Sequence, residues 1–290
     1  MSARRSDPYR ADRFSVSCEA LPALGFTEVR GLSVNVTVAT ETRSARGEAT
    51  NDNPPVAASM ASTTPEQRET DSPRLELRRG VTDDLLSRAG ASVETRRDAL
   101  DPEFGGTAPE PTAEHLEALA ETVRAVDADL GIANDGDADR IAITTPERGV
   151  VDPNWLFAAL YEHLLETEAG DAVRTVSTTF LIDRIAEAHG RSVHETPVGF
   201  KWVAEAMAEH DTLIGGEESG GFGLAGHLRN KDGVLLALAV AAAHSEEPLD
   251  DRLDRIRAEH GDIVQDRRSV DCPDDRKTAV LDRLEADLPE

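Results

Sequence analysis

The sequence predicts an α/β protein with two consecutive layered domains, preceded by a poorly ordered N-terminal segment. From residue 80 onward, short apolar runs typical of strands alternate with amphipathic segments typical of helices. Residues 1–79 contain 11 acidic and 11 basic residues, so the whole net charge of −25 belongs to residues 80–290. The first segment is rich in Ser, Thr, Ala and Arg, and residues 44–73 have the composition of a disordered chain. Regular alternation of strands and helices is typical of layered α/β domains.

The first predicted domain covers residues 80–150, and residues 31–40 ahead of it could form one further strand. Pro111 and Thr112 are typical of a helix start, and apolar residues at helical spacing follow them. The apolar positions on that helix face are Leu116, Leu119, Val123 and Val126. The complete prediction is a helix at 81–89, a strand at 91–94, the helix after Pro111, and strands at 129–133 and 140–144.

The second predicted domain covers residues 151–260. Pro153 lies early in a helix that carries three leucines at helical spacing, and the run at 233–243 is apolar enough for a buried helix. Residues 261–290 are expected to begin a C-terminal domain that is cut short. The predicted strands are 173–177, 192–195, 212–215 and 263–264, and the predicted helices are the one after Pro153, one around 181–185, and those at 201–209, 233–243 and 249–259.

The composition narrows the class of protein. The chain has 56 acidic residues against 31 basic ones, and only three of the basic residues are lysines, which is typical of a protein adapted to a very salty cytosol. Nucleic-acid binding is disfavoured because the sequence offers no basic cluster to pair with phosphates. The two cysteines form no disulfide framework, and no apolar run reaches membrane-spanning length. We therefore expect a cytoplasmic protein that does not contact a membrane.

The run Asn134–Arg140 is the most informative motif. Asp135, Asp137 and Asp139 alternate along a tight loop between two apolar strands, and Arg140 follows directly. Three carboxylates held this close repel one another unless a cation joins them, and hard oxygen ligands suit Mg²⁺. Arginine beside such a site suits a phosphate ester. An EF-hand is excluded because its sixth position would be Arg140 instead of glycine. A solvated acidic turn is the alternative.

The segment Glu195–Trp202 lies between a predicted strand and a predicted helix, where α/β proteins usually bind ligands. It contains Lys201, which is notable because arginine is the usual cation of this chain. Lysine can act near a sugar phosphate as a compact charge or as a proton donor. The alternative is an ordinary loop with a solvated lysine.

A glycine-rich segment at 215–223 forms the third motif. Its glycines would let the backbone approach a ligand, and Glu217 and Ser219 could then hydrogen-bond vicinal sugar hydroxyls. The segment 227–233 adds cations ahead of the apolar helix, including His227 as a weaker proton-transfer candidate and Arg229 as a substrate-binding candidate. The alternatives are a flexible surface loop and a helix entry capped by Asp232.

In this order and spacing, the three motifs resemble the α-D-phosphohexomutase family of phosphoglucomutases and phosphomannomutases. The resemblance implies two α/β/α sandwich domains with mixed sheets, domain II with the metal-binding loop and domain III with the sugar-binding loop. It implies that the three aspartates bind Mg²⁺ and that Thr196, Gly199 and Lys201 contact a sugar phosphate. It further implies that Arg140 stabilises the phosphoryl group and that Glu217 and Ser219 bind sugar hydroxyls. The implied substrate is a hexose phosphate, of glucose or mannose.

The sequence also departs from the family pattern. By resemblance, a first domain donates the phosphoryl group from a phosphoserine in a Ser-His-Asn-Pro loop, and a fourth domain clamps the other phosphate. No Ser-His-Asn-Pro string occurs in the sequence, and the nearest string, Ser62–Pro65, lacks the histidine. We therefore expect a phosphohexomutase-like protein without these two parts, for which full turnover by the chain alone is in doubt.

Two other interpretations stay open. The chain could be a non-catalytic sugar-phosphate-binding protein or subunit, completed by another chain. It could also be a degraded or frameshifted gene product, because the acidic bias is absent before residue 80. The sequence does not separate glucose, mannose and glucosamine phosphates, and it does not give an oligomeric state.

Overall fold

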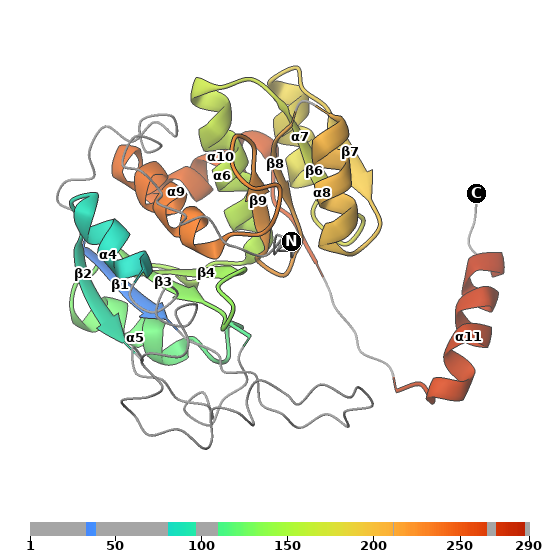
Figure 1. The fold of residues 1–290 in the computed structure, drawn as a ribbon, viewed down its shortest axis with the longest axis horizontal. Coiled ribbons are helices and arrows are strands. Elements are labelled where there is room, and N and C mark those ends of the chain that lie inside the picture. Colours follow the sequence, from blue (N-terminus) through green and yellow to red (C-terminus); the bar gives the residue numbers. More distant parts are fainter. Residues whose placement is uncertain (1–32, 39–80, 97–109, 211, 266–270, 288–290) are drawn as a thin grey trace, which may run out of the picture.

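A computed structural model describes residues 33–38, 81–96, 110–210, 212–265 and 271–287 of the chain. These residues form two layered α/β domains that lie side by side, and a helix extends beyond them (Figure 1). The fold class and the mixed sheets predicted from the sequence are confirmed. The prediction of disorder at 44–73 lies outside the described residues. Among the described residues, no helix combines the length and apolar character needed to cross a membrane.

The first domain has a five-stranded sheet in the order β2-β1-β3-β4-β5. Strands β1 and β2 are parallel to each other, β3 is parallel to β1, and β4 and β5 run antiparallel to their neighbours. The predicted strand within 31–40 is confirmed as β1, and it lies inside this sheet although the sequence places it far upstream. The elements are β1 (Ser33–Val38), α4 (Val81–Arg88), β2 (Ser92–Arg96), α5 (Glu117–Ala125), β3 (Leu130–Asn134), β4 (Ile141–Thr145) and β5 (Gly149–Val150).

Alternate residues of β3 and β4 face opposite sides of this sheet. Ile132 and Ile143 belong to the large core that also contains residues of α9, whereas Ala133 and Ala142 pack with α5. The α5 side consists of small residues because the helix approaches closely. A Cβ at Gly131 would lie 2.6 Å from Cγ2 of Val123 on α5. The sheet is thus covered on both faces, which holds the β3–β4 loop at its edge.

The second domain has a four-stranded sheet in the order β7-β6-β8-β9, with only β9 antiparallel. Helix α6 begins at Pro153, and Asp152 caps it by accepting a hydrogen bond from the Asn154 N–H at 2.8 Å. Helix α8 packs on β6 and β8. The elements are α6 (Pro153–Thr167), β6 (Asp171–Thr175), α7 (Leu181–Ala188), β7 (Val193–Thr196), α8 (Phe200–Glu209), β8 (Thr212–Gly216), β9 (Phe222–Leu224), α9 (Gly233–Glu246) and α10 (Leu249–His260).

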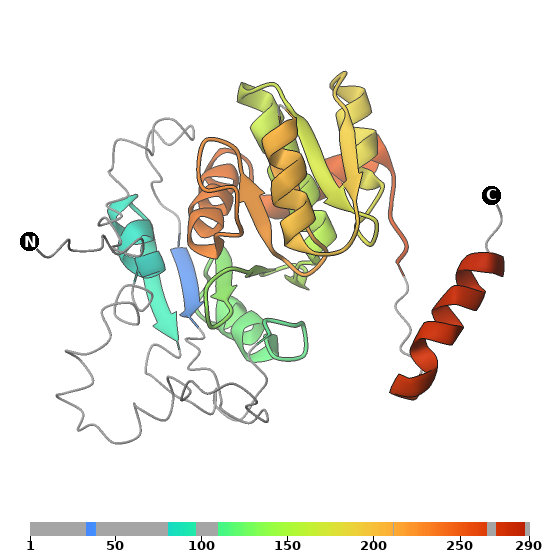
Figure 2. The same ribbon diagram turned by 45° about the vertical axis from the view of Figure 1, so that its right-hand side comes forward.

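Helix α9 joins the two domains. Both ribbon views place it between the two sheets (Figures 1 and 2), and it contacts α4, β3 and β4 on one side and α6 on the other. Ten of its residues are buried, which explains why its sequence is apolar all round. The domains therefore share one continuous core across α9.

Some element predictions were wrong or incomplete. Residues 263–264 form no strand, and the predicted strand 173–177 lies two residues earlier, as β6. Val126 is exposed at the end of α5 instead of packing on its apolar face. The short strands β5 and β9 and the helix α11 (Asp274–Asp287) were not predicted.

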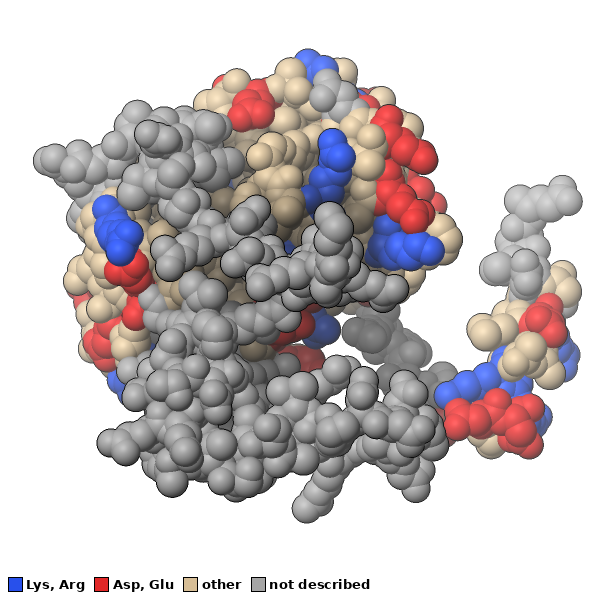
Figure 3. Space-filling model, in the orientation of Figure 1, with Lys and Arg blue, Asp and Glu red and all other residues tan. Residues whose placement is uncertain are grey.

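Helix α11 stands apart from both domains in Figures 1 and 2. Charged side chains crowd its first turn (Figure 3), where Lys277 and Asp274 form an ion pair at 2.5 Å. Its apolar residues Val280, Leu281 and Leu284 are exposed. This helix therefore adds nothing to either described core.

Candidate functional site

The acidic loop lies between β3 and β4, as predicted. Asn134 donates from Nδ2 to the Arg140 carbonyl at 2.9 Å, which closes the loop at its base. Asp135 accepts from the Arg140 N–H through Oδ1 at 3.1 Å, and its own carbonyl accepts from the Ala138 N–H at 3.0 Å. Ala138 has a positive φ of 55°, a conformation rarely adopted by residues with a side chain. The loop is thus held in a tight, strained shape by its own backbone.

The three aspartates converge. One carboxylate oxygen from each of Asp135, Asp137 and Asp139 lies within 4.8 Å of the others. Burial, helped by the charges of Asp139 and Asp137, raises the pKa of Asp135 to about 6, against the hydrogen bond from the Arg140 N–H. Oδ1 of Asp139 is buried and has no hydrogen-bond partner in the described part of the chain. Crowded hard oxygen donors, one of them unsatisfied, fit a Mg²⁺ ion.

Two cations border the aspartates. Nε of Arg140 lies 3.3 Å from Oδ2 of Asp135, and Nζ of Lys231 lies 2.6 Å from Oδ2 of Asp139. Lys231 was not predicted as a site residue, although its segment was noted for its cations. The rarity of lysine in the chain was the signal that could have identified it. Gly221 makes room for it, since a Cβ there would lie 2.3 Å from Cδ of Lys231.

Two glycines of the second domain form backbone hydrogen bonds with the aspartate loop and the start of β4. The Gly220 carbonyl accepts from the Ile141 N–H at 3.0 Å, and the Gly233 N–H donates to the Ala138 carbonyl at 2.8 Å. Gly220 has a φ of +84°, and a Cβ there would lie 2.6 Å from the Ile141 carbonyl oxygen. These glycines therefore permit a backbone contact between the two domains, in addition to any approach to a ligand.

Glu217 connects the two ligand-loop candidates of the second domain. Its side chain is largely buried, and Oε1 accepts from the Gly199 N–H at 3.0 Å. Gly199 has a φ of +122° at the start of α8. Ser219 is exposed beside Glu217. The structure thus brings together Glu217 and Gly199, and Ser219 lies two residues after Glu217 on the same segment; all three were predicted to bind substrate.

The other predicted residues lie less centrally. The Lys201 side chain is 72% exposed and contacts Glu205 and the Trp202 ring on its own helix. Thr196 is buried and donates to the Arg174 carbonyl at 3.5 Å, so its hydroxyl is engaged within the sheet. His227 lies 3.1 Å from Asp232 through Nε2, and Arg229 is exposed.

The loop after β6 was not predicted to belong to the site. Ser177 donates from Oγ to Oε2 of Glu218 at 2.7 Å, which ties this loop to the glycine-rich segment. Val176 and Phe180 are exposed on it, close in sequence to the carboxyl end of a parallel strand. In the sequence, the apolar residues just after a strand were the signal that could have identified this loop as part of the site.

Comparisons with known proteins identify the two α/β domains. The family model for phosphoglucomutase/phosphomannomutase, α/β/α domain II, matches residues 78–149, and the domain III model of that family matches residues 152–259. The chain is 36% identical over 201 residues to a probable phosphoglucosamine mutase of Methanobrevibacter smithii, covering 69% of this chain and 43% of that protein. The chain thus spans less than half the length of that relative.

Two solved structures share the fold. A crystal structure of a phosphomannomutase homologue from Thermus thermophilus matches with a TM-score of 0.63 and 25% identity, covering 84% of this chain and 50% of that one. A structure of Aspergillus fumigatus N-acetylphosphoglucosamine mutase in complex with GlcNAc-6P and magnesium matches with a TM-score of 0.50 and 15% identity, covering 82% of this chain and 51% of that one.

Proposed function

Because the chain belongs to the phosphoglucomutase/phosphomannomutase family, we propose that its two described domains bind Mg²⁺ and a hexose phosphate for phosphoryl transfer. One observation carries this proposal. Three carboxylate ligands converge beside Arg140 in a loop that the glycine-rich segment of the second domain contacts directly. Metal ligands and sugar-binding candidates thus meet at one domain boundary.

Asp135, Asp137 and Asp139 would hold the metal, which when bound neutralises charge on a transferring phosphoryl group. The Arg140 guanidinium supplies a fixed positive charge beside the loop for phosphate oxygens. Glu217 keeps one carboxylate oxygen on the Gly199 N–H and has the other available for a sugar hydroxyl. Lys201 is the proton-transfer candidate, with His227 second, and its exposure leaves it free to reach a bound sugar phosphate.

The substrate class proposed here is a glucose, mannose or glucosamine phosphate. The amino sugar is included because the name of the Methanobrevibacter smithii relative refers to glucosamine. Magnesium is proposed on the donor chemistry of the aspartate loop, and the Aspergillus fumigatus complex that shares this fold contains that metal.

Metal binding is the first test. Calorimetry of Mg²⁺ binding in molar KCl, which suits so acidic a chain, should show at least about tenfold weaker binding for Asp137→Asn, because the substitution removes one of three charged ligands. Asp282→Asn removes an exposed aspartate on α11 and serves as the matched control. An unchanged isotherm for Asp137→Asn would sink the metal assignment.

We propose a second function, a sugar-phosphate-binding protein that uses the same loops without turnover, because the proton-transfer candidate Lys201 is 72% exposed and contacts only Glu205 and Trp202 among its described partners. An assay of glucose 1-phosphate to glucose 6-phosphate conversion with a bisphosphate activator separates the two functions. Turnover by the purified chain would refute the binding-only function. Saturable binding of the sugar phosphates without turnover would refute a self-sufficient enzyme.

A further inference from the structure

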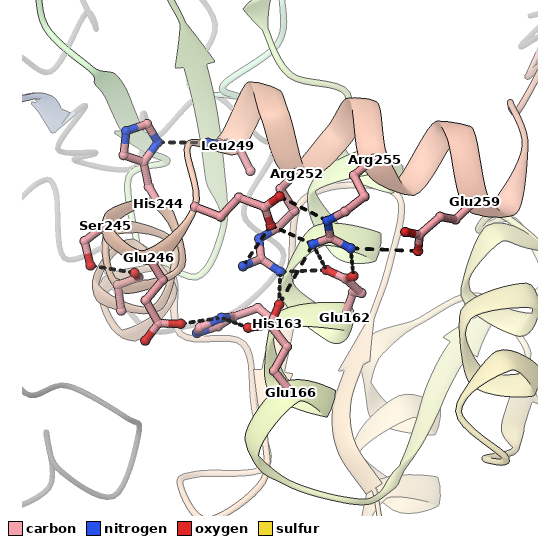
Figure 4. Close-up of polar contacts among 12 residues, drawn as sticks. Glu162, His163, Glu166, His244, Ser245, Glu246, Leu249, Arg252, Arg255 and Glu259 are labelled. Atoms are coloured by element: carbon pink, nitrogen blue, oxygen red, sulfur yellow. Dashed lines mark hydrogen bonds and ion pairs between the residues drawn. The ribbon is translucent and has the colours of Figure 1, made fainter.

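A second group of metal-ligating side chains lies on the opposite end of α9 from the aspartate loop. His163 and Glu166 occupy adjacent turns of α6 and face Glu246, the last residue of α9 (Figure 4). Nδ1 of His163 lies 3.5 Å from Oε2 of Glu246 and 3.7 Å from Oε2 of Glu166. One ligand atom from each residue lies within 4.8 Å of the others. We propose that these three side chains bind a divalent transition-metal ion, with Zn²⁺ the best match.

The imidazole of His163 supports a ligand at this position. The side chain is only 9% exposed, and its Nδ1 has no hydrogen-bond partner among the residues that the structure describes. The two carboxylate oxygens are too distant for hydrogen bonds, which join such atoms at about 2.7–3.2 Å. A buried polar nitrogen left without a partner is costly, and a metal ion would satisfy it.

The protonation state of His163 is also the one that a metal needs. Burial lowers the pKa of His163, and the charge of Arg252 lowers it further, against the charges of Glu246 and Glu166. The ring is therefore neutral at neutral pH, and a neutral imidazole can direct a nitrogen lone pair at a metal.

The distances match a tetrahedral ion. Zinc sits about 2.1 Å from nitrogen and oxygen ligands, which sets ligand–ligand separations of about 3.4 Å. The two contacts of Nδ1, at 3.5 and 3.7 Å, are close to that value. One imidazole with two carboxylates favours zinc or a similar transition metal over Mg²⁺, which prefers oxygen ligands alone. Glu246 is 48% exposed, so an ion can enter from solvent.

The carboxyl ends of α6 and α9 add to the attraction of this site for a cation. Glu166 lies in the last turn of α6, and Glu246 ends α9. The carboxyl end of a helix carries partial negative charge, so a cation between two such ends is stabilised by both. The same arrangement without a cation places two carboxylates against two negative helix ends.

The surrounding ion pairs leave a negative surplus. Arg252 binds Glu166 only through Oε1, at 2.6 Å, which leaves Oε2 facing His163. The connected cluster in Figure 4 contains five carboxylates and two guanidiniums, a net charge of −3 that a divalent cation would largely offset. Its charged members are Glu162, Glu166, Glu246, Glu247, Glu259, Arg252 and Arg255.

Zinc binding to the full chain tests the proposal. Calorimetry with ZnCl₂ is run in a C18S/C272S background, because thiols bind zinc, and in excess Mg²⁺, which occupies the aspartate loop. We expect one zinc equivalent in the parent that His163→Gln and Glu246→Gln bind at least about tenfold more weakly. Co²⁺ in place of Zn²⁺ should show intense visible absorption typical of a tetrahedral site, and both variants should lose it.

Two controls keep the result specific. His194→Gln removes a histidine outside the cluster, and Asp137→Asn disrupts the aspartate loop, so both should retain the zinc equivalent. Glu246 is partly exposed at a helix end, so its variant tests the site even where His163→Gln unfolds. The proposal is overturned when the parent binds no zinc under these conditions, or when Glu246→Gln binds zinc as tightly as the parent.

Discussion

Two buried carboxylates, Asp135 in the first domain and Glu162 in the second, show opposite perturbations. Burial and neighbouring aspartates raise the pKa of Asp135 to about 6. Burial also acts on Glu162, but the hydrogen bond from Arg255 and the charge of Arg252 outweigh it, so the pKa of Glu162 is lowered. A buried acid that its own chain neutralises is structural, whereas one left among like charges indicates a site for an external cation.

Breaking the ion pairs around Glu162 in the second domain should therefore give the largest change in the free energy of unfolding. Arg252 is 1% exposed and contacts Glu162 and Glu166 at 2.6 Å, so Arg252→Ala leaves carboxylates buried without their partner. We expect the free energy of unfolding to fall by about 3–5 kcal/mol in urea titrations of the metal-free protein. Arg257→Ala, on the same helix but half exposed, should cost about 1 kcal/mol or less. Equal losses would show that the cluster is no more than surface charge.

The raised pKa of Asp135 should make the free energy of unfolding decrease as pH rises, whereas the lowered pKa of Glu162 makes it decrease as pH falls. Its pKa of about 6 in the folded protein exceeds its ordinary value of 3.8, so the folded state holds the proton more tightly than the unfolded state does. In EDTA, the free energy of unfolding should fall as pH rises from about 4 to above 6, by roughly 3 kcal/mol at most.

The measurement is the difference between the stability profiles of the parent and Asp135→Asn, since the variant keeps every other acid. The difference should become independent of pH below about 4, where Asp135 is protonated in both states. Excess Mg²⁺ should offset the loss above pH 6, because the ion binds only the folded loop. A difference that grows toward acid pH would contradict the raised pKa.

Backbone contacts from the second domain support the aspartate loop, in addition to the hydrogen bonds within the loop. Gly220→Ala adds a Cβ 2.6 Å from the Ile141 carbonyl oxygen at a φ of +84°, whereas Gly226→Ala has a similar φ of +75° and open space. Strain alone should cost about 1 kcal/mol at each glycine. We expect Gly220→Ala to cost about 1 kcal/mol more than that and to weaken Mg²⁺ binding severalfold. Equal losses of both stability and Mg²⁺ affinity would rule out the domain contact as a support of the loop.

Local patterns in the sequence were sufficient to predict the aspartate loop. Apolar strands on both sides of 134–140 and the alternation of aspartates are short-range features, and they predict both the turn and the convergence of carboxylates. Helix α9 was likewise predicted from its apolar run. These elements are determined by contacts close in sequence.

Long-range features were not predicted. Strand β1 was expected, but its place between β2 and β3 depends on pairing across more than fifty intervening residues. The apolar pair Ile263–Val264 was predicted as a strand, but it finds no sheet edge to pair with in the described structure, and Val264 stays exposed. The contact of Lys231 with Asp139 joins two domains and has no local signature. Tertiary pairing determined these three features, and periodicity alone could not predict them.

The two lysines near the loops provide the smallest and most discriminating test. The Lys231 side chain is 16% exposed and forms an ion pair with Asp139. The Lys201 side chain is 72% exposed, and its described contacts are all with residues of its own helix. Lys231→Met should strengthen Mg²⁺ binding by about fivefold, or roughly 1 kcal/mol, because the ammonium no longer competes for the carboxylate. Lys201→Met should leave the Mg²⁺ affinity unchanged in the same calorimetry. If both variants bind Mg²⁺ like the parent, Lys231 does not stand in for a cation at Asp139, and the contrast between Asp135, left among like charges, and Glu162, paired by two arginines, fails at the contact closest to the aspartates.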